Sequence, residues 1–143
     1  MVVFKQINTE ETYKLRLEVL KTCEEYAYKY QGDFDKNTIH IGAFENNNLI
    51  GIVSLMKTSN NSFKGKQMQL RGMAIIKSSQ GKSVGAKLIN KCVLFCRDRQ
   101  IDLIWCNARK ESVDFYKKQG FEIHGESFHI KNVGIHYVMV YSY

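Results

Sequence analysis

Apolar and polar residues follow two different spacings along this chain of 143 residues. Apolar runs of strand length predict seven β-strands, at 2–7, 40–45, 49–57, 67–76, 103–106, 121–130 and 135–143. Helix-type spacing and capping residues predict helices at 10–20, 84–96 and 112–119. We therefore expect the order strand, helix, three strands, helix, strand, helix, two strands.

The first helix is predicted from its cap and its apolar spacing. Asn8 or Thr9 caps the helix, and the two glutamates that follow suit the positive end of its dipole. Tyr13, Leu17 and Leu20 recur at three- and four-residue spacing, so we expect them to form the buried face.

The second helix and two turns have clearer signals. One apolar stripe along the helix consists of Val84, Leu88, Ile89, Cys92, Val93 and Cys96. Asparagines at 46–48 tolerate the left-handed backbone of a tight hairpin turn. Gly120 suits the left-handed end of the third helix.

This order of elements predicts the fold class. A strand–helix–strand unit in the middle of the chain requires a parallel pair, whereas the hairpins imply antiparallel neighbours. We expect an α/β fold, in the looser α+β sense: a mixed, mostly antiparallel sheet of six or seven strands with helices on both faces. The chain has no proline, Gly/Ser-rich linker or internal repeat, so residues 1–143 are predicted to form a single domain.

Composition narrows the class of protein. The longest apolar run, 49–56, is far shorter than the ~20 residues of a membrane span, and no secretory signal begins the chain. We expect a cytoplasmic protein without a membrane partner. Cys23, Cys92, Cys96 and Cys106 are expected to be reduced and mostly buried, and they lack the spacing of a zinc site, so no metal is expected.

The basic charge leaves two kinds of anionic partner open. A net charge of +7 suits a polyphosphate ligand as well as DNA. Lysines and arginines are spread along the chain without a run of five. Tyr26, Tyr28 and Tyr30 with Lys29 are the only aromatic and basic cluster, and they suit a substrate wall or a dimer contact equally well. A basic nucleic-acid-binding module is therefore one alternative.

The turn between the strand at 67–76 and the second helix is the most informative segment. At the start of a helix, unpaired N–H groups and the dipole favour an anion. Small residues at Gly81, Ser83, Gly85 and Ala86 leave room for phosphate oxygens, and Lys82 adds a positive charge. On these grounds alone, a phosphate site and a packing turn are equal alternatives. The turn matches neither a P-loop nor a dinucleotide-binding fingerprint.

Several linked motifs resemble one enzyme family. Gln80-Gly-Lys-Ser-Val-Gly85 resembles the Gln/Arg-x-x-Gly-x-Gly/Ala pyrophosphate loop of GNAT acyltransferases. The segments Trp105-Cys-Asn-Ala-Arg109 and Phe115-Tyr-Lys-Lys-Gln-Gly-Phe121 are similar to that family's fifth strand, following helix and sixth strand. Further motifs, at 15–20, 70–74, 125–128 and 134–139, resemble one bacterial subgroup. The resemblance covers essentially the whole chain in order.

This resemblance implies an N-acetyltransferase that moves an acetyl group from acetyl-CoA to a primary amine of a small acceptor by direct attack. It implies that Tyr116 is the general acid. The cofactor contacts that it implies are Met73, Ala74, Ile75, Gln80, Gly81, Lys82, Ser83, Val84, Gly85, Ala86 and Asn107. Ser83 departs from the family's first loop glycine, at a cost of ~1 kcal/mol if its φ is positive. A non-catalytic acyl-CoA-binding domain is the alternative, and the presence of Tyr116 disfavours it.

The acceptor side is less specific. Arg16, Arg71 and Arg109 lie on motif segments and are candidates to bind an anion, with ion-paired surface as the alternative. His136 and His40 are candidate proton relays or structural histidines. Candidate bases are Asp33, Asp35 and Glu45, with none preferred. The arginines suggest a small acceptor with an anionic group. Acyl chain length stays open, as does a homodimer, a common assembly in the superfamily.

Overall fold

The structure of this protein is a computed structural model that describes residues 1–20 and 28–143, so Cys23 and Tyr26 lie outside the described residues. The strands are β1 (Val2–Ile7), β2 (Ile39–Glu45), β3 (Asn48–Met56), β4 (Gln67–Ile75), β5 (Leu103–Arg109), β6 (Glu122–Ile130) and β7 (Gly134–Ser142). The α-helices are α1 (Tyr13–Leu20), α2 (Val84–Asp98) and α3 (Val113–Lys118), with short 3-10 turns at Glu10–Thr12, Lys77–Ser79 and Lys110–Ser112. The predicted order of elements is confirmed.

The seven strands form a sheet in the order β1-β2-β3-β4-β5-β7-β6. Neighbours β1–β2, β2–β3, β5–β7 and β6–β7 are antiparallel, whereas β4 and β5 are parallel from the pair Gln67–Leu103 to the pair Gln69–Trp105. The mixed, mostly antiparallel sheet is therefore confirmed. The chain forms two compact units, unit 1 (Met1–Met56 and Leu70–Cys92) and unit 2 (Lys57–Gln69 and Val93–Tyr143).

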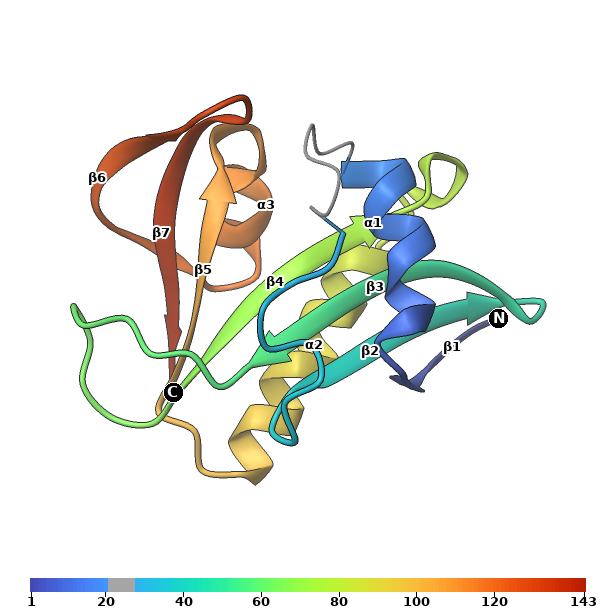
Figure 1. The fold of residues 1–143 in the computed structure, drawn as a ribbon, viewed down its shortest axis with the longest axis horizontal. Helices are drawn as coiled ribbons and strands as arrows, with labels where there is room; N and C mark the ends of the chain where they lie inside the picture. The colour runs from blue at the N-terminus through green and yellow to red at the C-terminus, as the bar shows by residue number, and fades with distance from the viewer. Residues whose placement is uncertain (21–27) are drawn as a thin grey trace. The chain divides into compact units, whose positions relative to one another are not determined.

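Unit 1 has three layers, with α1 over one face of its strands and the first turns of α2 behind the other (Figure 1). Successive residues of β3 face opposite layers. Ile52 packs in a core cluster with Leu15 of α1, whereas a side chain at Gly51 would meet Val84 and Leu88 of α2. Helices on both faces follow from this alternation.

The buried face of α1 differs from the prediction. Leu17 is 49% exposed, whereas Leu15 and Arg16 are buried. Arg16 turns inward because it forms an ion pair with Asp33, at 2.8 Å. Leu20 packs against the core cluster as predicted, so the prediction is wrong for Leu17 and missed the burial of Leu15 and Arg16.

Other local predictions for unit 1 are confirmed. Asn46 and Asn47 have φ values of 50° and 65° in the β2–β3 turn, the left-handed conformation that a tight hairpin requires. Asn8 begins the first helical segment, where its Oδ1 accepts from the N–H of Glu11 and the Glu11 carboxylate accepts from the N–H of Asn8. This reciprocal pair is a capping box.

Unit 2 is held together by an aromatic cluster and by β5–β7 pairing. The ring of Phe121 lies 5.4 Å from that of Tyr116 and 5.7 Å from that of Tyr141. Pairing with β7 continues along β5 as far as Arg109, three residues beyond the predicted strand end. No helix among the described residues is long and apolar enough to cross a membrane.

Candidate active site

The turn between β4 and α2 has the backbone geometry of an anion-binding loop. Gly81 and Ser83 both have positive φ, at 76° and 66°. A side chain at Gly81 would meet nothing within 4 Å, so the space around it is open. Gly81 adopts this left-handed conformation without steric cost, whereas Ser83 adopts it despite its side chain.

The first turn of α2 presents donors beside that open space. The N–H of Lys87 donates to the carbonyl of Ser83 at 3.1 Å, which is the first hydrogen bond of the helix. The N–H groups of Val84, Gly85 and Ala86 precede this bond and lack intrahelical acceptors. Lys82 is exposed in the same turn, and Gly85 and Ala86 add little bulk. These residues fit a pyrophosphate, because donors, positive charge and room occur together.

The end of β4 supplies further backbone donors. The N–H of Ile76 donates to the carbonyl of Ile50 on β3, so by alternation the N–H groups of Ile75 and Met73 point away from β3. The carbonyl of Ile75 accepts from Nε2 of Gln80 at 2.9 Å. Gln80 therefore joins the loop to the strand end. Ala74 lies in the core cluster, so its methyl group faces inward.

In unit 2, Tyr116 lies on α3 and is 7% exposed. Its ring packs edge-on against Phe115 and Phe121, at 5.2 and 5.4 Å between centroids. These contacts restrict the orientation of the ring, and with it the direction of the phenolic O–H.

The other candidates of unit 2 lie on β5 and β7. Asn107 is exposed on β5, opposite Val138. Arg109 is half-buried, and its cross-strand partner is His136. His136 is buried, and its Nδ1–H donates to the carbonyl of Gly134 at 2.9 Å. That bond holds the imidazole against its own strand.

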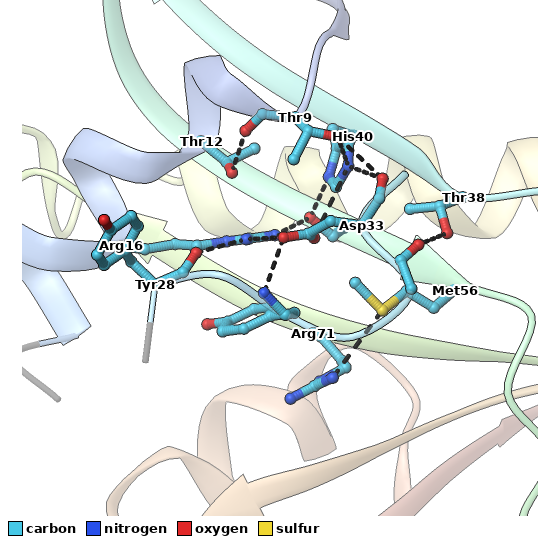
Figure 2. Close-up of polar contacts among 12 residues, drawn as sticks. Thr9, Thr12, Arg16, Tyr28, Asp33, Thr38, His40, Met56 and Arg71 are labelled. Carbon is cyan, nitrogen blue, oxygen red and sulfur yellow. Dashed lines mark hydrogen bonds and ion pairs between the residues drawn. The ribbon is translucent and has the colours of Figure 1, made fainter. Parts of the chain in front are cut away.

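The buried network around Asp33 in unit 1 uses two of the residues considered above. Arg16 donates to both carboxylate oxygens of Asp33, at 2.8 and 3.0 Å, and also to the carbonyl of Tyr28 and to Oγ of Ser54 (Figure 2). Arg16 is 1% exposed, and its charge is paired with Asp33 inside the protein, although its Nε has no hydrogen-bond partner among the described residues. The polar contacts of Arg16 are therefore with groups inside the protein, and the Asp33 carboxylate, which is paired with it, is not free to act as a base.

His40 belongs to the same network. Its Nε2–H donates to the carbonyl of Asp33 at 3.1 Å, and Nδ1 lies 2.6 Å from Oγ of Ser54. Burial lowers the pKa of His40, and the positive charge of Arg16 acts in the same direction. Neutral His40 accepts a hydrogen bond from the Ser54 hydroxyl at Nδ1, so both of its ring nitrogens have partners inside the protein.

Arg71 differs from Arg16, although the ring of Tyr30 contacts both guanidinium groups. Arg71 is half-buried, and its Nη1 lies 4.0 Å from the sulfur of Met56. The sequence indicated Tyr30 as part of an aromatic and basic cluster, but it did not indicate the contacts of its ring with Arg16 and Arg71, because residues 28–38 form turns without a periodic pattern. A tyrosine between arginines distant in the sequence gives no local signal.

Within residues 1–20 and 28–143, no group of three His, Cys, Asp or Glu side chains is arranged to hold a metal ion.

Comparison with known proteins identifies the family. Residues 4–121 match the model of the acetyltransferase (GNAT) family. The chain is 30% identical over 141 residues to a Bacillus subtilis (strain 168) protein described as the uncharacterized N-acetyltransferase YitI, which covers 97% of this chain and 95% of that relative.

Solved structures share the fold. Escherichia coli ElaA has a TM-score of 0.82 at 18% identity, covering 99% of this chain and 100% of that one. PaiA N-acetyltransferase from Thermoplasma acidophilum, solved in complex with coenzyme A, has a TM-score of 0.74 at 18% identity, covering 100% and 99%. Since the family match spans most of the sequence, this chain belongs to the GNAT family of acetyltransferases and is an acyltransferase.

Proposed function

We propose that the protein transfers the acetyl group of acetyl-CoA to a primary amine of a small acceptor by direct attack. The observation that carries this proposal is the turn at 80–86, which combines helix N–H groups, an open glycine and a lysine. In the proposal, these groups hold the pyrophosphate, and the N–H groups of Met73 and Ile75 hold the pantetheine arm and the thioester. Bound acetyl-CoA supplies the reactive acyl carbon.

Two proton movements limit such a transfer. An amine with a pKa near 10.4 is neutral about one time in 2,500 at pH 7, which costs ~4.6 kcal/mol. The departing thiol resembles cysteine, with a pKa of ~8.5, so a phenol with a pKa near 10 is able to protonate it. We assign that donation to Tyr116, whose ring orientation is restricted by Phe115 and Phe121. Asn107 is proposed as a further cofactor contact.

The direct test is a thermal-unfolding titration of the protein with acetyl-CoA, CoA, ATP and a short DNA duplex in parallel. A ligand at a hundred times its Kd stabilises the folded state by ~2.7 kcal/mol, which raises Tm by several degrees in a domain of this size. We expect saturable shifts with acetyl-CoA and CoA, and little shift with ATP or DNA.

Each arm of the titration has a distinct meaning. Acetyl-CoA-dependent acetylation of a primary amine, detected by release of free thiol, completes the test of the activity. No stabilisation by acetyl-CoA or CoA would contradict the proposal. A shift with DNA alone, falling steeply with added salt, would favour the nucleic-acid-binding alternative.

A further inference from the structure

Two arginines of unit 1 contact one tyrosine ring. The guanidinium carbon of Arg16 lies 3.8 Å from the ring centroid of Tyr30, and that of Arg71 lies 4.4 Å from it. Contacts at this range are attractive cation–π contacts. Two positive charges, one from the middle of α1 and one from the middle of β4, are therefore close together.

Only one of these charges is neutralised by a described carboxylate. The two terminal nitrogens of Arg16 donate to the two carboxylate oxygens of Asp33, so this bidentate pair occupies both oxygens. Among the described residues, no Asp or Glu lies within ion-pair distance of Arg71. Nη1 of Arg71 instead lies 4.0 Å from the sulfur of Met56, which is a weak acceptor (Figure 2).

The environment of Arg71 makes this unmatched charge unfavourable. Burial lowers the pKa of Arg71, because desolvation disfavours the charged form, and the nearby charge of Arg16 acts in the same direction, whereas Tyr30 and Asp33 partly oppose the shift. An anion bound at Arg71 would offset both effects. A half-buried guanidinium with free donors is suited to carboxylate or phosphate.

The surroundings also hold Tyr30 in place. The N–H of Tyr30 donates to the Asp33 carboxylate at 2.8 Å, which fixes the loop to Arg16. A side chain at residue 72 would lie 3.0 Å from Cε2 of Tyr30, and Gly72 has a φ of 63°. Glycine at this position therefore lets the tyrosine ring rest against β4. This contact pre-organises Arg71 before any ligand binds.

We propose that Arg71 binds an anionic group of the acceptor, a carboxylate or a phosphate, so that the acceptor is a small primary amine that is also an acid. The inference rests on the proposed acetyl transfer, in which Met73 contacts the thioester. Arg71 precedes Met73 by two residues on the same strand, so their Cα atoms are at most roughly 7 Å apart. The anion and the reacting amine therefore belong to one small molecule, and Arg16 and Asp33 serve as positioning residues.

The test compares matched acceptors. Primary amines that carry a carboxylate or a phosphate are assayed beside their neutral carboxamide or alcohol counterparts. We expect the wild type to prefer the anionic member of each pair. Arg71→Ala is expected to lower kcat/KM for the anionic members by roughly 10- to 150-fold and to leave the neutral members unaffected. Arg71→Lys should retain part of the preference, because it keeps the charge without the fork of donors.

A binding measurement accompanies the kinetics. The CoA-saturated protein is titrated with the same amines, and its Tm is followed, so turnover is not required. Arg99→Ala is the matched control, since Arg99 also stacks on an aromatic ring, 3.5 Å from Phe95, but is exposed. We expect this variant to behave as the wild type does toward every amine.

Three results would overturn the inference while acetyl-CoA still stabilises the protein. One is equal use of the anionic and neutral members, and another is an equal loss of both in Arg71→Ala. The third is that no anionic amine either reacts or raises Tm. Absence of any stabilisation by acetyl-CoA is a different failure, which would remove the proposed function and this inference with it.

Discussion

Among single residues, Ser83 departs most clearly from the family's loop pattern, and its φ of 66° shows what that departure costs. A side chain in the left-handed conformation is disfavoured by about 1 kcal/mol relative to glycine. Ser83→Gly is therefore expected to raise the free energy of unfolding by about 1 kcal/mol, or roughly 3 °C in Tm for a chain of this length. Urea and thermal unfolding measure this change, and an acetyl-CoA titration shows whether affinity changes with it.

The control for that variant lies in the same turn. Ser78 is exposed but is not among the residues with positive φ, so Ser78→Gly adds freedom to the unfolded chain without relieving strain. We expect this change to lower stability by up to about 1 kcal/mol. Opposite signs for the two substitutions would support the conformational explanation, and equal signs would contradict it.

Tyr116 is the residue on which the proposed chemistry depends most. Tyr116→Phe keeps the ring that packs on Phe115 and Phe121 and removes only the hydroxyl. With the proton donor gone, kcat is expected to fall by ~100-fold or more, with the acetyl-CoA Kd unchanged. Tyr141→Phe, in the same aromatic cluster, is the control and should keep kcat. An unaltered kcat in Tyr116→Phe would assign the acid to another group.

Some site residues can be predicted from the sequence and others cannot, and the difference lies in how far apart in the sequence their contact partners are. The loop at 80–86 is one continuous motif, so its position between β4 and α2 and its residue types can be read from the local sequence, whereas its positive φ values at Gly81 and Ser83 come from the structure. Asp33 pairs with Arg16 across 17 residues, and Tyr30 meets Arg71 across an even longer separation. No local spacing signals either contact.

For the helices and strands, apolar spacing predicted the buried residues correctly where apolar burial alone decides which side chains face inward. Five of the six residues of the predicted apolar stripe of α2, namely Val84, Leu88, Ile89, Cys92 and Cys96, are 4% exposed or less, whereas Val93 is half-buried. The same reasoning was wrong for Leu17 of α1, which is exposed, because the helix buries Leu15 and the ion-paired Arg16 instead. The end of β5 was predicted too early, because Asn107 and Arg109 continue the strand by pairing with β7 rather than by burial.

The junction of β2, β3 and the loop before β2 is expected to make stability depend on pH. His40 is buried there with its pKa lowered, so near pH 6 the unfolded chain binds a proton that the folded protein does not. The free energy of unfolding should therefore fall as pH drops through about 6.5, by at most about 1.4 kcal/mol per pH unit. Urea titrations between pH 5 and 8 measure this slope, and His40→Gln should flatten it. Identical slopes would show that another group is responsible.

For the whole molecule, a net charge of +7 does not by itself identify a partner. The described contacts show that the positive charges are not equivalent: Arg16 is neutralised by a buried carboxylate, whereas Arg71 and Lys82 lie where an anion is expected. Family membership assigns the chemistry, and these local differences suggest where anions bind. That residues 1–143 fold as one domain stays a prediction, because the chain forms two compact units.

Buried thiols offer a test of that prediction. Cys92 lies in unit 1 and Cys106 in unit 2, and both are fully or almost fully buried. Burial raises the pKa of Cys106 to about 12, so its thiolate is scarce at neutral pH in the folded protein. A thiol reagent should therefore label each cysteine only after its unit opens, and peptide mass spectrometry resolves the two sites. In one cooperative domain, both become reactive over the same range of urea concentration, which coincides with loss of secondary structure. Labelling of one cysteine at clearly lower urea than the other would show that the two units unfold independently.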